Sequence, residues 1–299
     1  MEAKNVLAIV VTYNRLSLLQ RCVQHIQSQE ARPDLLVINN SSPDGTEAWL
    51  KESGIDFITQ PNGGSSAGWK TGINEGLRRG YEYVWLMDDD GFPHPAALKT
   101  LLAHVTPDTA ILSSIVVKEN KPDEFVFGLP VVNSHQQPVV FAKKRKYSSF
   151  AELPDTGGQY PFAHLFNGAL LNLAIAQKVG GINTDYFIYG EEVDYYCRML
   201  EGGYKVRYQL DAIHYHPDVS QRVIDKIRVY YFIRNTIILN NRYFDSAFIR
   251  NILTVGVALA RLAKRNGILN ALGYIAGGNS KYVWMGIKDG FTRNFIKRY

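Results

Sequence analysis

Four short strand-like runs lie between residues 6 and 88, and each ends in a turn of small and polar residues. The runs are Val6 to Thr12, Leu35 to Ile38, Asp56 to Thr59 and Val84 to Met87. The segments between them have helical spacing or carry helix signals: Leu16 to Ile26, a stretch near Trp49, and Trp69 to Arg79. This alternation predicts an α/β fold with a doubly wound, largely parallel sheet and helices on both faces. The polar turns should therefore line one ligand crevice at the carboxyl edge of the sheet.

The last of these runs ends in three consecutive carboxylates, Asp88, Asp89 and Asp90, followed by Gly91. Like charges this close repel one another, and a hard divalent cation with oxygen ligands relieves that repulsion. The alternative is an Asp-rich turn that caps the helix beginning near Pro95, since Asp is a favoured N-cap residue. The position at the end of a strand, facing other polar loops, favours the metal site.

Two phosphate-binding motifs are absent from the glycine-rich turns. A Walker A loop needs Lys directly after its second glycine, but Trp69 follows Gly68 and Lys70 comes one place late. The dinucleotide fingerprint belongs after the first strand, where the chain has Thr12-Tyr13-Asn14-Arg15 and no glycine. The sequence therefore predicts neither a P-loop nor a dinucleotide site.

Composition is that of an ordinary soluble protein, with 46% hydrophobic and 20% charged residues. The two cysteines, Cys22 and Cys197, lie in helix-like apolar patterns, so we expect buried thiols in a reducing compartment. The chain shows no signal-peptide pattern and no run of about 18 apolar residues. We therefore expect a cytoplasmic protein.

Charge is unevenly distributed along the chain. Residues 1–221 carry 19 basic and 25 acidic groups, a balance of −6, whereas residues 222–299 carry 14 and 3, a balance of +11, and the two sum to +5. A basic tail predicts a polyanionic partner. Its apolar helical stretches, such as Ile252 to Leu262 with basic residues at the ends, suit a helix in a membrane interface. The alternatives are packing on the rest of the protein or a homodimer interface; no nucleic-acid motif is present, so no nucleic-acid partner is expected.

Residues 118–165 show no clear period, and we expect a long loop there. It includes the basic run Lys143-Lys144-Arg145-Lys146 and the pair Gly157-Gly158. Such a basic run is usually a solvated face, and its functional alternative is contact with a lipid diphosphate.

Taken in order, the motifs resemble those of the inverting family 2 glycosyltransferases of GT-A fold, and within them the bacterial rhamnosyltransferase and galactofuranosyltransferase branch. The resemblance rests on Thr12–Arg15, Asn39–Thr46, Asn62–Gly72, Asp88–Asp90, Asn167–Leu171, Val179–Gly181, Phe187–Asp194, Gly203–Val206 and Tyr215–His216. It covers about residues 5–240. It implies a GT-A catalytic domain over residues 1–221, with a donor half of about 1–117 and an acceptor half of about 160–221, followed by a basic amphipathic helical region over 222–299.

The resemblance also assigns the donor site. It implies that the nucleotide-sugar contacts come from the strand ends and the glycine-rich turn: Thr12, Tyr13, Asn14, Arg15, Asn39, Asn62, Gly64, Gly68, Lys70, Asp88 and Asp89. Asn39 stands where the family usually has an Asp that contacts the base. An amide both donates and accepts hydrogen bonds, so the base stays open between UDP and dTDP.

The metal site follows by the same resemblance. Asp90 would bind Mn²⁺ or Mg²⁺ bridging the diphosphate, Asp88 would contact ribose or donor sugar and is a second candidate ligand, and Asp89 can share either task. His216 occupies the late ligand position, with His214 as its rival. The alternative is that strand alternation puts both histidines on one face as ordinary polar residues.

Inverting transfer needs a base that takes the proton of the acceptor hydroxyl. Glu192 matches the second acid of the family's Glu-Asp-x-Asp motif, although the family has Asp there, and Glu191 and Asp194 remain candidates. A helix begins at this point, and its N-terminal dipole favours an ionised carboxylate.

Together these features imply a metal-dependent inverting glycosyltransferase that extends a lipid-linked bacterial surface polysaccharide at the inner face of the cytoplasmic membrane. The three-Asp run favours UDP-galactofuranose as donor, with dTDP-rhamnose and UDP-hexoses as alternatives. The departures at Asn39 and Glu192 leave open a non-catalytic homologue that binds sugar nucleotide or glycan. The tail leaves open an interfacial assembly protein of a polysaccharide machine.

Overall fold

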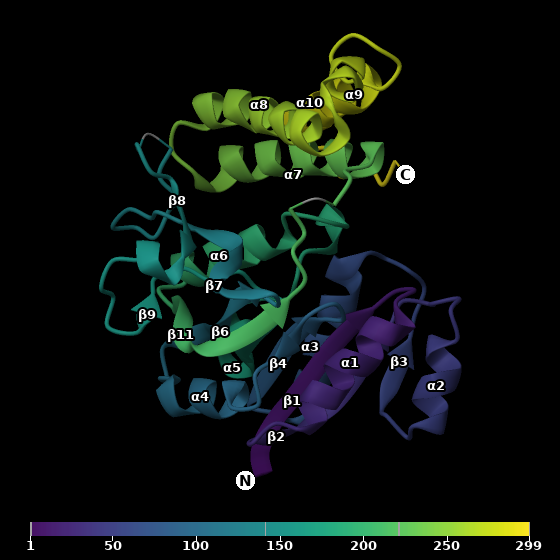
Figure 1. The fold of residues 1–299 in the computed structure, drawn as a ribbon, viewed down its shortest axis with the longest axis vertical. Coiled ribbons are helices and arrows are strands. Elements are labelled where there is room, and N and C mark those ends of the chain that lie inside the picture. Colours follow the sequence, from purple (N-terminus) through teal and green to yellow (C-terminus); the bar gives the residue numbers. More distant parts are fainter. Residues whose placement is uncertain (1, 141, 221, 299) are drawn as a thin grey trace. The chain divides into compact units, whose positions relative to one another are not determined.

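A mixed, mostly parallel sheet organises the N-terminal part of the chain in the computed structural model (Figure 1), which describes residues 2–140, 142–220 and 222–298, and side chains from residue 5. The first four strands are β1 (Glu2–Thr12), β2 (Arg32–Asn39), β3 (Phe57–Thr59) and β4 (Tyr83–Asp88). They pair in parallel in the order β3-β2-β1-β4. The helices between them are α1 (Leu16–Gln27), α2 (Thr46–Glu52) and α3 (Ser65–Arg79). The predicted strand and helix series is confirmed.

The second half of the sheet continues from β4. Strand β10 (Asn167–Asn172) pairs antiparallel with both β4 and β6 (Thr109–Lys118), and β11 (Lys205–His216) pairs parallel with β6. Two antiparallel steps restore the strand direction, so β6 and β11 run the same way as β1 and β4. The ends of β1, β4 and β11 therefore lie at the same edge. The smaller elements are β5 (Phe92–Pro93), α4 (Ala97–His104), β9 (Gln159–Tyr160) and α5 (Leu173–Val179).

The loop expected over residues 118–165 is wrong in part, because β7 (Lys121–Pro130) and β8 (Lys146–Ser149) lie within it and pair antiparallel, with β7 also pairing with β6. The short helix η1 (Phe150–Glu152) follows β8. Strand β7 begins with exposed Lys121, Pro122 and Asp123 and shows no clean alternation of burial. Its partner in β8 is distant in sequence, so local periodicity carried no signal for this pairing.

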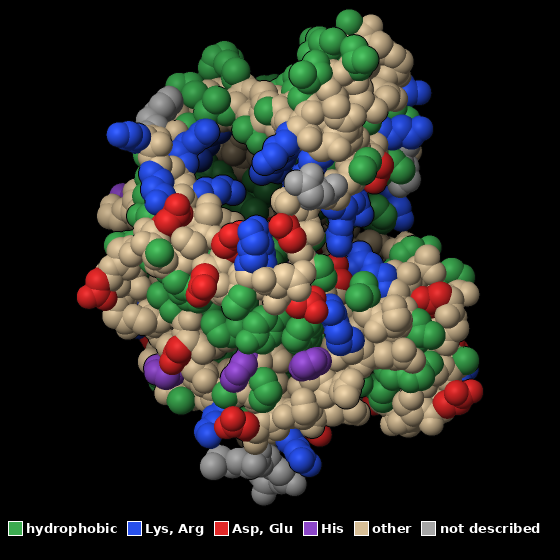
Figure 2. Space-filling model, in the orientation of Figure 1, with side chains coloured by type: hydrophobic (Ala, Val, Ile, Leu, Met, Phe, Trp, Pro, Cys, Tyr) green, Lys and Arg blue, Asp and Glu red, His purple; other side chains and the backbone are tan. Residues whose placement is uncertain are grey.

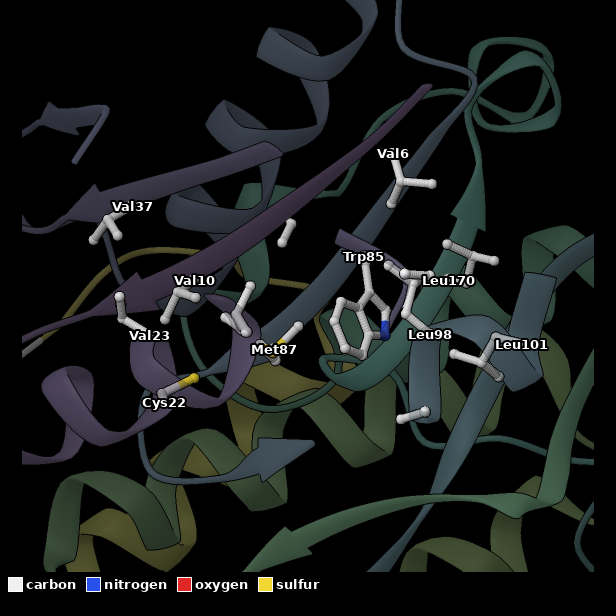
Figure 3. Close-up of a cluster of buried hydrophobic side chains, with 14 of the residues drawn as sticks. Val6, Val10, Cys22, Val23, Val37, Trp85, Met87, Leu98, Leu101 and Leu170 are labelled. Carbon is white, nitrogen blue, oxygen red and sulfur yellow. The ribbon is translucent and has the colours of Figure 1, made fainter. Parts of the chain in front are cut away.

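Burial on both faces explains the continuous apolar run of β1. Val6 and Val10 point to one face, where Figure 3 shows them with Trp85 and Met87 of β4 and with side chains of α1 and α4. The intervening residues of β1 point to the other face, toward α3. Cys22 of α1 and Cys197 are both buried free thiols, as predicted.

Helix α3 packs very closely on the sheet through three glycines at four-residue spacing. A Cβ added at Gly68, Gly72 or Gly76 would lie 2.5 Å from a methyl carbon of Val11, Ile9 or Val84, respectively. Real Cβ atoms do not approach this closely, so only glycine allows the helix to approach at this distance.

The chain divides into two compact units. The sheet unit comprises Met1–Ile182 and Arg198–Asp218, and the helical unit comprises Asn183–Cys197 and Val219–Tyr299. The helical unit contains η2 (Thr184–Tyr186), most of α6 (Glu191–Glu201), α7 (Lys226–Tyr243), α8 (Ala247–Asn266), α9 (Ile268–Gly273) and α10 (Ser280–Phe291). Residues 183–197, which lie within the acceptor half expected from the sequence, thus pack with the C-terminal helices. Within the described residues, no helix has the length and apolarity needed to span a membrane.

Candidate functional site

Asp89 ties the end of β4 to the end of β1. Thr12 Oγ1 donates a 2.7 Å hydrogen bond to Asp89 Oδ2, and Arg15 Nη1 lies 2.9 Å from both Asp89 Oδ1 and Asp90 Oδ2. Burial raises the pKa of Asp89 to about 6, although Arg15 and Thr12 act in the opposite direction. Both oxygens of Asp89 therefore have protein partners, and this carboxylate holds the turn in place.

Asp90 also contacts the end of β11. Its Oδ1 lies 3.0 Å from His216 Nε2, while His216 Nδ1 lies 2.7 Å from the carbonyl oxygen of Pro217. A carbonyl oxygen only accepts hydrogen bonds, so Nδ1 carries a proton, and in a neutral ring the lone pair of Nε2 faces the carboxylate. The lone pair of His216 Nε2 and the carboxylate oxygen of Asp90 repel each other at this distance. Either a proton on Nε2 or a cation bound between the two atoms removes this repulsion. An imidazole whose other nitrogen donates to a backbone carbonyl is the usual arrangement of a metal-ligating histidine.

His214 lies deeper than His216. Its side chain is fully buried, and neither ring nitrogen has a hydrogen-bond partner among the described residues. Its ring packs against Gly91 and Gly168. A Cβ added at Gly91 would lie 2.2 Å from His214 Nε2, and a Cβ added at Gly168 would lie 3.1 Å from His214 Nδ1. Burial, with the charge of His216 adding, lowers the pKa of His214 to about 3. His214 is thus a neutral ring packed under the Asp90–Gly91 turn.

The amides predicted to contact the donor hold loops at this edge. Buried Asn39 accepts from the backbone N–H of Ser42 at 3.0 Å and donates to Thr59 Oγ1 at 3.2 Å. Asn62 Oδ1 accepts from the backbone N–H of Gly64 at 3.0 Å. The Asn39 side chain thereby joins the turns that follow β2 and β3.

The remaining predicted donor residues differ in their exposure and in their contacts. Tyr13 and Lys70 are exposed at the surface of the sheet unit, and the backbone N–H of Asn14 donates to Ser42 Oγ at 3.0 Å. Gly68 is buried against β1, where it serves helix packing. Asp88 ends β4, and its backbone N–H donates to the carbonyl of Phe166 at 2.8 Å.

The acidic cluster at the start of α6 belongs to the helical unit. Asp194 is buried and accepts from Tyr243 Oη at 2.8 Å and from Tyr186 Oη at 3.4 Å. Burial, with the charge of Glu191 adding, raises the pKa of Glu192 to about 8. Asp194 is therefore engaged in packing α6 on α7, whereas Glu192 has the proton affinity that a base needs near neutral pH.

Two residues of α7 hold the loop that leads into α6. Asn235 Nδ2 donates to the carbonyls of Tyr186 at 3.0 Å and Ile188 at 2.9 Å, and also to that of Tyr189. Fully buried Arg234 donates through Nη2 to the carbonyl of Tyr186 at 3.2 Å. The loop needs this support because two of its non-glycine residues, Phe187 and Tyr189, have left-handed φ angles of 63° and 62°.

Sequence reasoning missed this role of Arg234 and Asn235. The available signal was a charged residue and an amide inside an otherwise apolar helical stretch, since such groups are buried only with partners. It also missed Arg21, whose Nη2 donates to the backbone carbonyl of Asp90 at 3.2 Å.

We predict that Asn235→Ala destabilises the protein by about 2 kcal/mol, because it removes the donor shared by three loop carbonyls. The free energy of unfolding in urea measures this change. Asn270→Ala, at an exposed position in α9, is the control and should change stability by less than about 0.5 kcal/mol. Equal effects of the two substitutions would contradict the role assigned to Asn235.

The chain is similar in sequence to known glycosyltransferases. Residues 7–167, which are 161 of the 299 residues, match the sequence profile described as "Glycosyl transferase family 2". A galactofuranosyltransferase of Mycolicibacterium smegmatis is 29% identical over 220 residues, covering 71% of this chain and 70% of its own. A galactofuranosyltransferase of Mycobacterium tuberculosis is 29% identical over 225 residues, covering 72% and 70%.

Solved structures support the fold. A mannosyltransferase from Pyrobaculum calidifontis, in complex with GDP-Man and Mn²⁺, superposes with a TM-score of 0.56 at 14% identity and covers 99% of this chain and 88% of its own. GalNAc-T7 with UDP, GalNAc and Mn²⁺ superposes with a TM-score of 0.61 at 10% identity, covering 97% and 58%. The family match spans more than half of the chain and includes the turns after β1, β2 and β4. The chain therefore belongs to glycosyl transferase family 2 and is a glycosyltransferase of GT-A fold.

Proposed function

We propose that this enzyme is a metal-dependent inverting galactofuranosyltransferase that extends a lipid-linked bacterial surface glycan. The donor would be UDP-galactofuranose, which the names of the two mycobacterial relatives support. The observation that carries the proposal is the contact between Asp90 Oδ1 and His216 Nε2 at the carboxyl edge of the sheet. Transfer of rhamnose from dTDP-rhamnose, or of a hexose from a UDP-hexose, is the alternative that a donor panel would reveal.

The residues present fit a divalent cation. Among the described residues, no three His, Cys, Asp or Glu side chains form a metal-binding group. Mg²⁺ and Mn²⁺ at phosphate sites are nevertheless often held by one or two protein side chains together with phosphate oxygens and waters. Asp90 and His216 would hold the cation on the protein side. When bound, it offsets the charge that develops on the departing nucleoside diphosphate.

The chain's own groups divide the other tasks. Thr12 and Arg15 keep the Asp89 turn in place, and in this arrangement Asp88 and Asp90 would face the donor. Asp88 would orient the donor sugar or ribose. Glu192 would take the proton of the acceptor hydroxyl, since its raised pKa gives its carboxylate a high affinity for a proton at neutral pH.

Donor binding tests the metal site. We expect wild-type protein to bind UDP more tightly with Mn²⁺ than with EDTA in isothermal titration calorimetry. Asp90→Asn and His216→Ala should each weaken Mn²⁺-dependent UDP binding by roughly tenfold or more, because each removes one of two protein ligands. Asp123→Asn, at an exposed acid of β7, should leave it unchanged. UDP affinity that is the same in Mn²⁺ and EDTA would overturn the metal proposal.

The pH dependence of transfer tests the base. A base works only when deprotonated, so kcat/KM should rise with pH through about 8 and level off above it. Glu191→Gln removes the neighbouring negative charge, which should lower the pKa of Glu192 and move this rise to lower pH.

Glu192→Gln should lower transfer by roughly 10²-fold or more while UDP still binds. This pair of results also excludes a non-catalytic binding homologue. Wild-type rates in Glu192→Gln would remove Glu192 from the mechanism.

Peripheral attachment to the inner face of the cytoplasmic membrane is part of the proposal. Among the described residues, 12 of the 14 large hydrophobic side chains that are exposed lie between residues 223 and 296. Helix α8 is apolar on two faces: one packs within the helical unit, and the other exposes Phe248 and Ile252. On α9, Ile268 and Leu269 are 71% and 86% exposed. Apolar side chains on a unit rich in Lys and Arg fit an anionic lipid surface.

Flotation with vesicles tests this attachment. Wild-type protein should float with phosphatidylcholine vesicles that contain phosphatidylglycerol, and less with phosphatidylcholine alone. The double substitution Ile268→Gln and Leu269→Gln should lower the bound fraction by roughly tenfold, because two aliphatic side chains no longer insert. Asn270→Gln on the same helix is the control. Undiminished flotation of the double variant would count against α9 as the contact.

A further inference from the structure

The segment that follows α10 reaches the loop that leads into α6. Arg234 of α7 lies between them: its Nη1 donates to the carbonyl of Ile296 at 3.3 Å, and its Nη2 donates to the carbonyl of Asp185 at 3.1 Å. The ring of Phe295 also packs edge-on against Tyr186 of the loop, with the ring centres 5.4 Å apart. One buried guanidinium and one aromatic pair therefore join the segment to the loop within the helical unit.

Lys297 makes a further contact between the segment and the loop. Its ammonium nitrogen lies 4.4 Å from the ring centre of Phe187, and a cation over the face of an aromatic ring is attracted to it. Phe187 has a left-handed φ of 63°, which a bulky side chain rarely adopts. Such a conformation persists only where the surroundings hold it, so this contact supports the loop at a strained position.

An ion pair with α10 holds the segment itself. Arg298 contacts both carboxylate oxygens of Asp289, with Nε 2.6 Å from Oδ2 and Nη2 3.0 Å from Oδ1. Tyr230 Oη of α7 donates to Asp289 Oδ2 at 2.7 Å, and the backbone N–H of Asn294 donates to the carbonyl of Asp289 at 2.8 Å. The chain between Asp289 and Arg298 therefore closes on itself, and residues 294–297 lie inside this closed stretch.

The burial of Asp289 distinguishes this pair from ordinary surface pairs. Figure 2 shows Lys and Arg side chains over the C-terminal helices, and an exposed cation contributes little to stability because solvent screens it. The side chain of Asp289 is only 1% exposed, and its contact with Arg298 is bidentate. Removing the guanidinium would leave a buried carboxylate without its cation, so the closed position of the segment depends on Arg298.

We infer that Arg298 is a positioning residue for glycosyl transfer. Through Asp289 it holds residues 294–297 against the loop that leads to Glu192, which lies at the start of α6. The inference rests on the proposed function, in which Glu192 is the base. A displacement of about 1 Å, caused far from the reacting atoms, can cost roughly 10²-fold in rate. Holding the loop would therefore keep the carboxylate within reach of the acceptor hydroxyl.

Transfer rates of Arg298 variants test this role. Arg298→Gln removes the ion pair and should lower kcat by roughly tenfold, because the loop is no longer held. Arg298→Lys keeps a cation beside Asp289 and should recover part of the rate, although it loses the bidentate contact. Binding of UDP with Mn²⁺ should be unchanged in both, since the proposed donor site belongs to the sheet unit. Arg293→Gln, at an exposed arginine of the same segment, is the control and should transfer as wild type does.

Thermal unfolding separates positioning from a purely structural role. Rates are compared at a temperature where every variant is folded. A lower melting temperature of Arg298→Gln with an unchanged kcat would make Arg298 a structural residue and overturn the inference. Equal losses of kcat in Arg298→Gln and Arg293→Gln would overturn it as well.

Hydrogen exchange follows the loop without any substrate. The backbone N–H groups of Phe187 and Ile188 donate to the carbonyls of Thr184 and Tyr186, respectively. These two amides should exchange roughly tenfold faster in Arg298→Gln than in wild type, whereas the amides of β1 should exchange at the wild-type rate. Unchanged exchange of the loop would overturn the inference, even if transfer is slower.

The inference and the proposed base fail in different ways. If Glu192→Gln transfers at the wild-type rate while the loop of Arg298→Gln exchanges faster, the base is refuted and the hold of the segment on the loop is supported. If Glu192→Gln is inactive while Arg298→Gln keeps the wild-type kcat, the base is supported and the positioning role of Arg298 is refuted.

Discussion

The buried contact of Asp89 with Thr12 and Arg15 joins the ends of two parallel strands that are 77 residues apart in sequence. Burying a carboxylate is costly, and the hydrogen bond and ion pair offset that cost. Both carboxylate oxygens of Asp89 have protein partners, so the conformation of the turn is fixed. The turn in turn sets the positions of the neighbouring Asp88 and Asp90. The donor chemistry proposed for the sheet unit depends on this arrangement, and so does the approach of Asp90 to His216.

A second constraint operates in the helical unit. The loop before α6 has left-handed φ angles at Phe187, Tyr189 and Gly190, and it is stabilised by buried donors from α7. The same loop leads into Glu192 at the start of α6. In both units, buried polar groups support a turn whose next residues are proposed to carry the chemistry. The two proposed tasks, donor binding and proton removal, thus depend on different packing units.

Much of the fold was predictable because its signals are local. The apolar runs of β1 and β4, the turns after them and the helical spacing of α1 and α3 each lie within a few residues of sequence. The β7–β8 pairing was missed because its partners are distant and its first residues are exposed. The close packing of Gly68, Gly72 and Gly76 on the sheet was also missed, although small residues at four-residue spacing were visible in the sequence.

The sequence by itself determined the parallel sheet, the carboxylate turn at its edge and the acidic cluster at the start of a helix, since strand period and turn chemistry are short-range properties. The tertiary structure alone decided that Asp90 contacts His216, while His214 packs against Gly91. It also decided that Asp194 accepts a hydrogen bond from Tyr243. It also decided that Asn235 holds a loop 46 to 49 residues earlier in the chain. These contacts join distant segments, and only the packing of helices and strands brings such segments together.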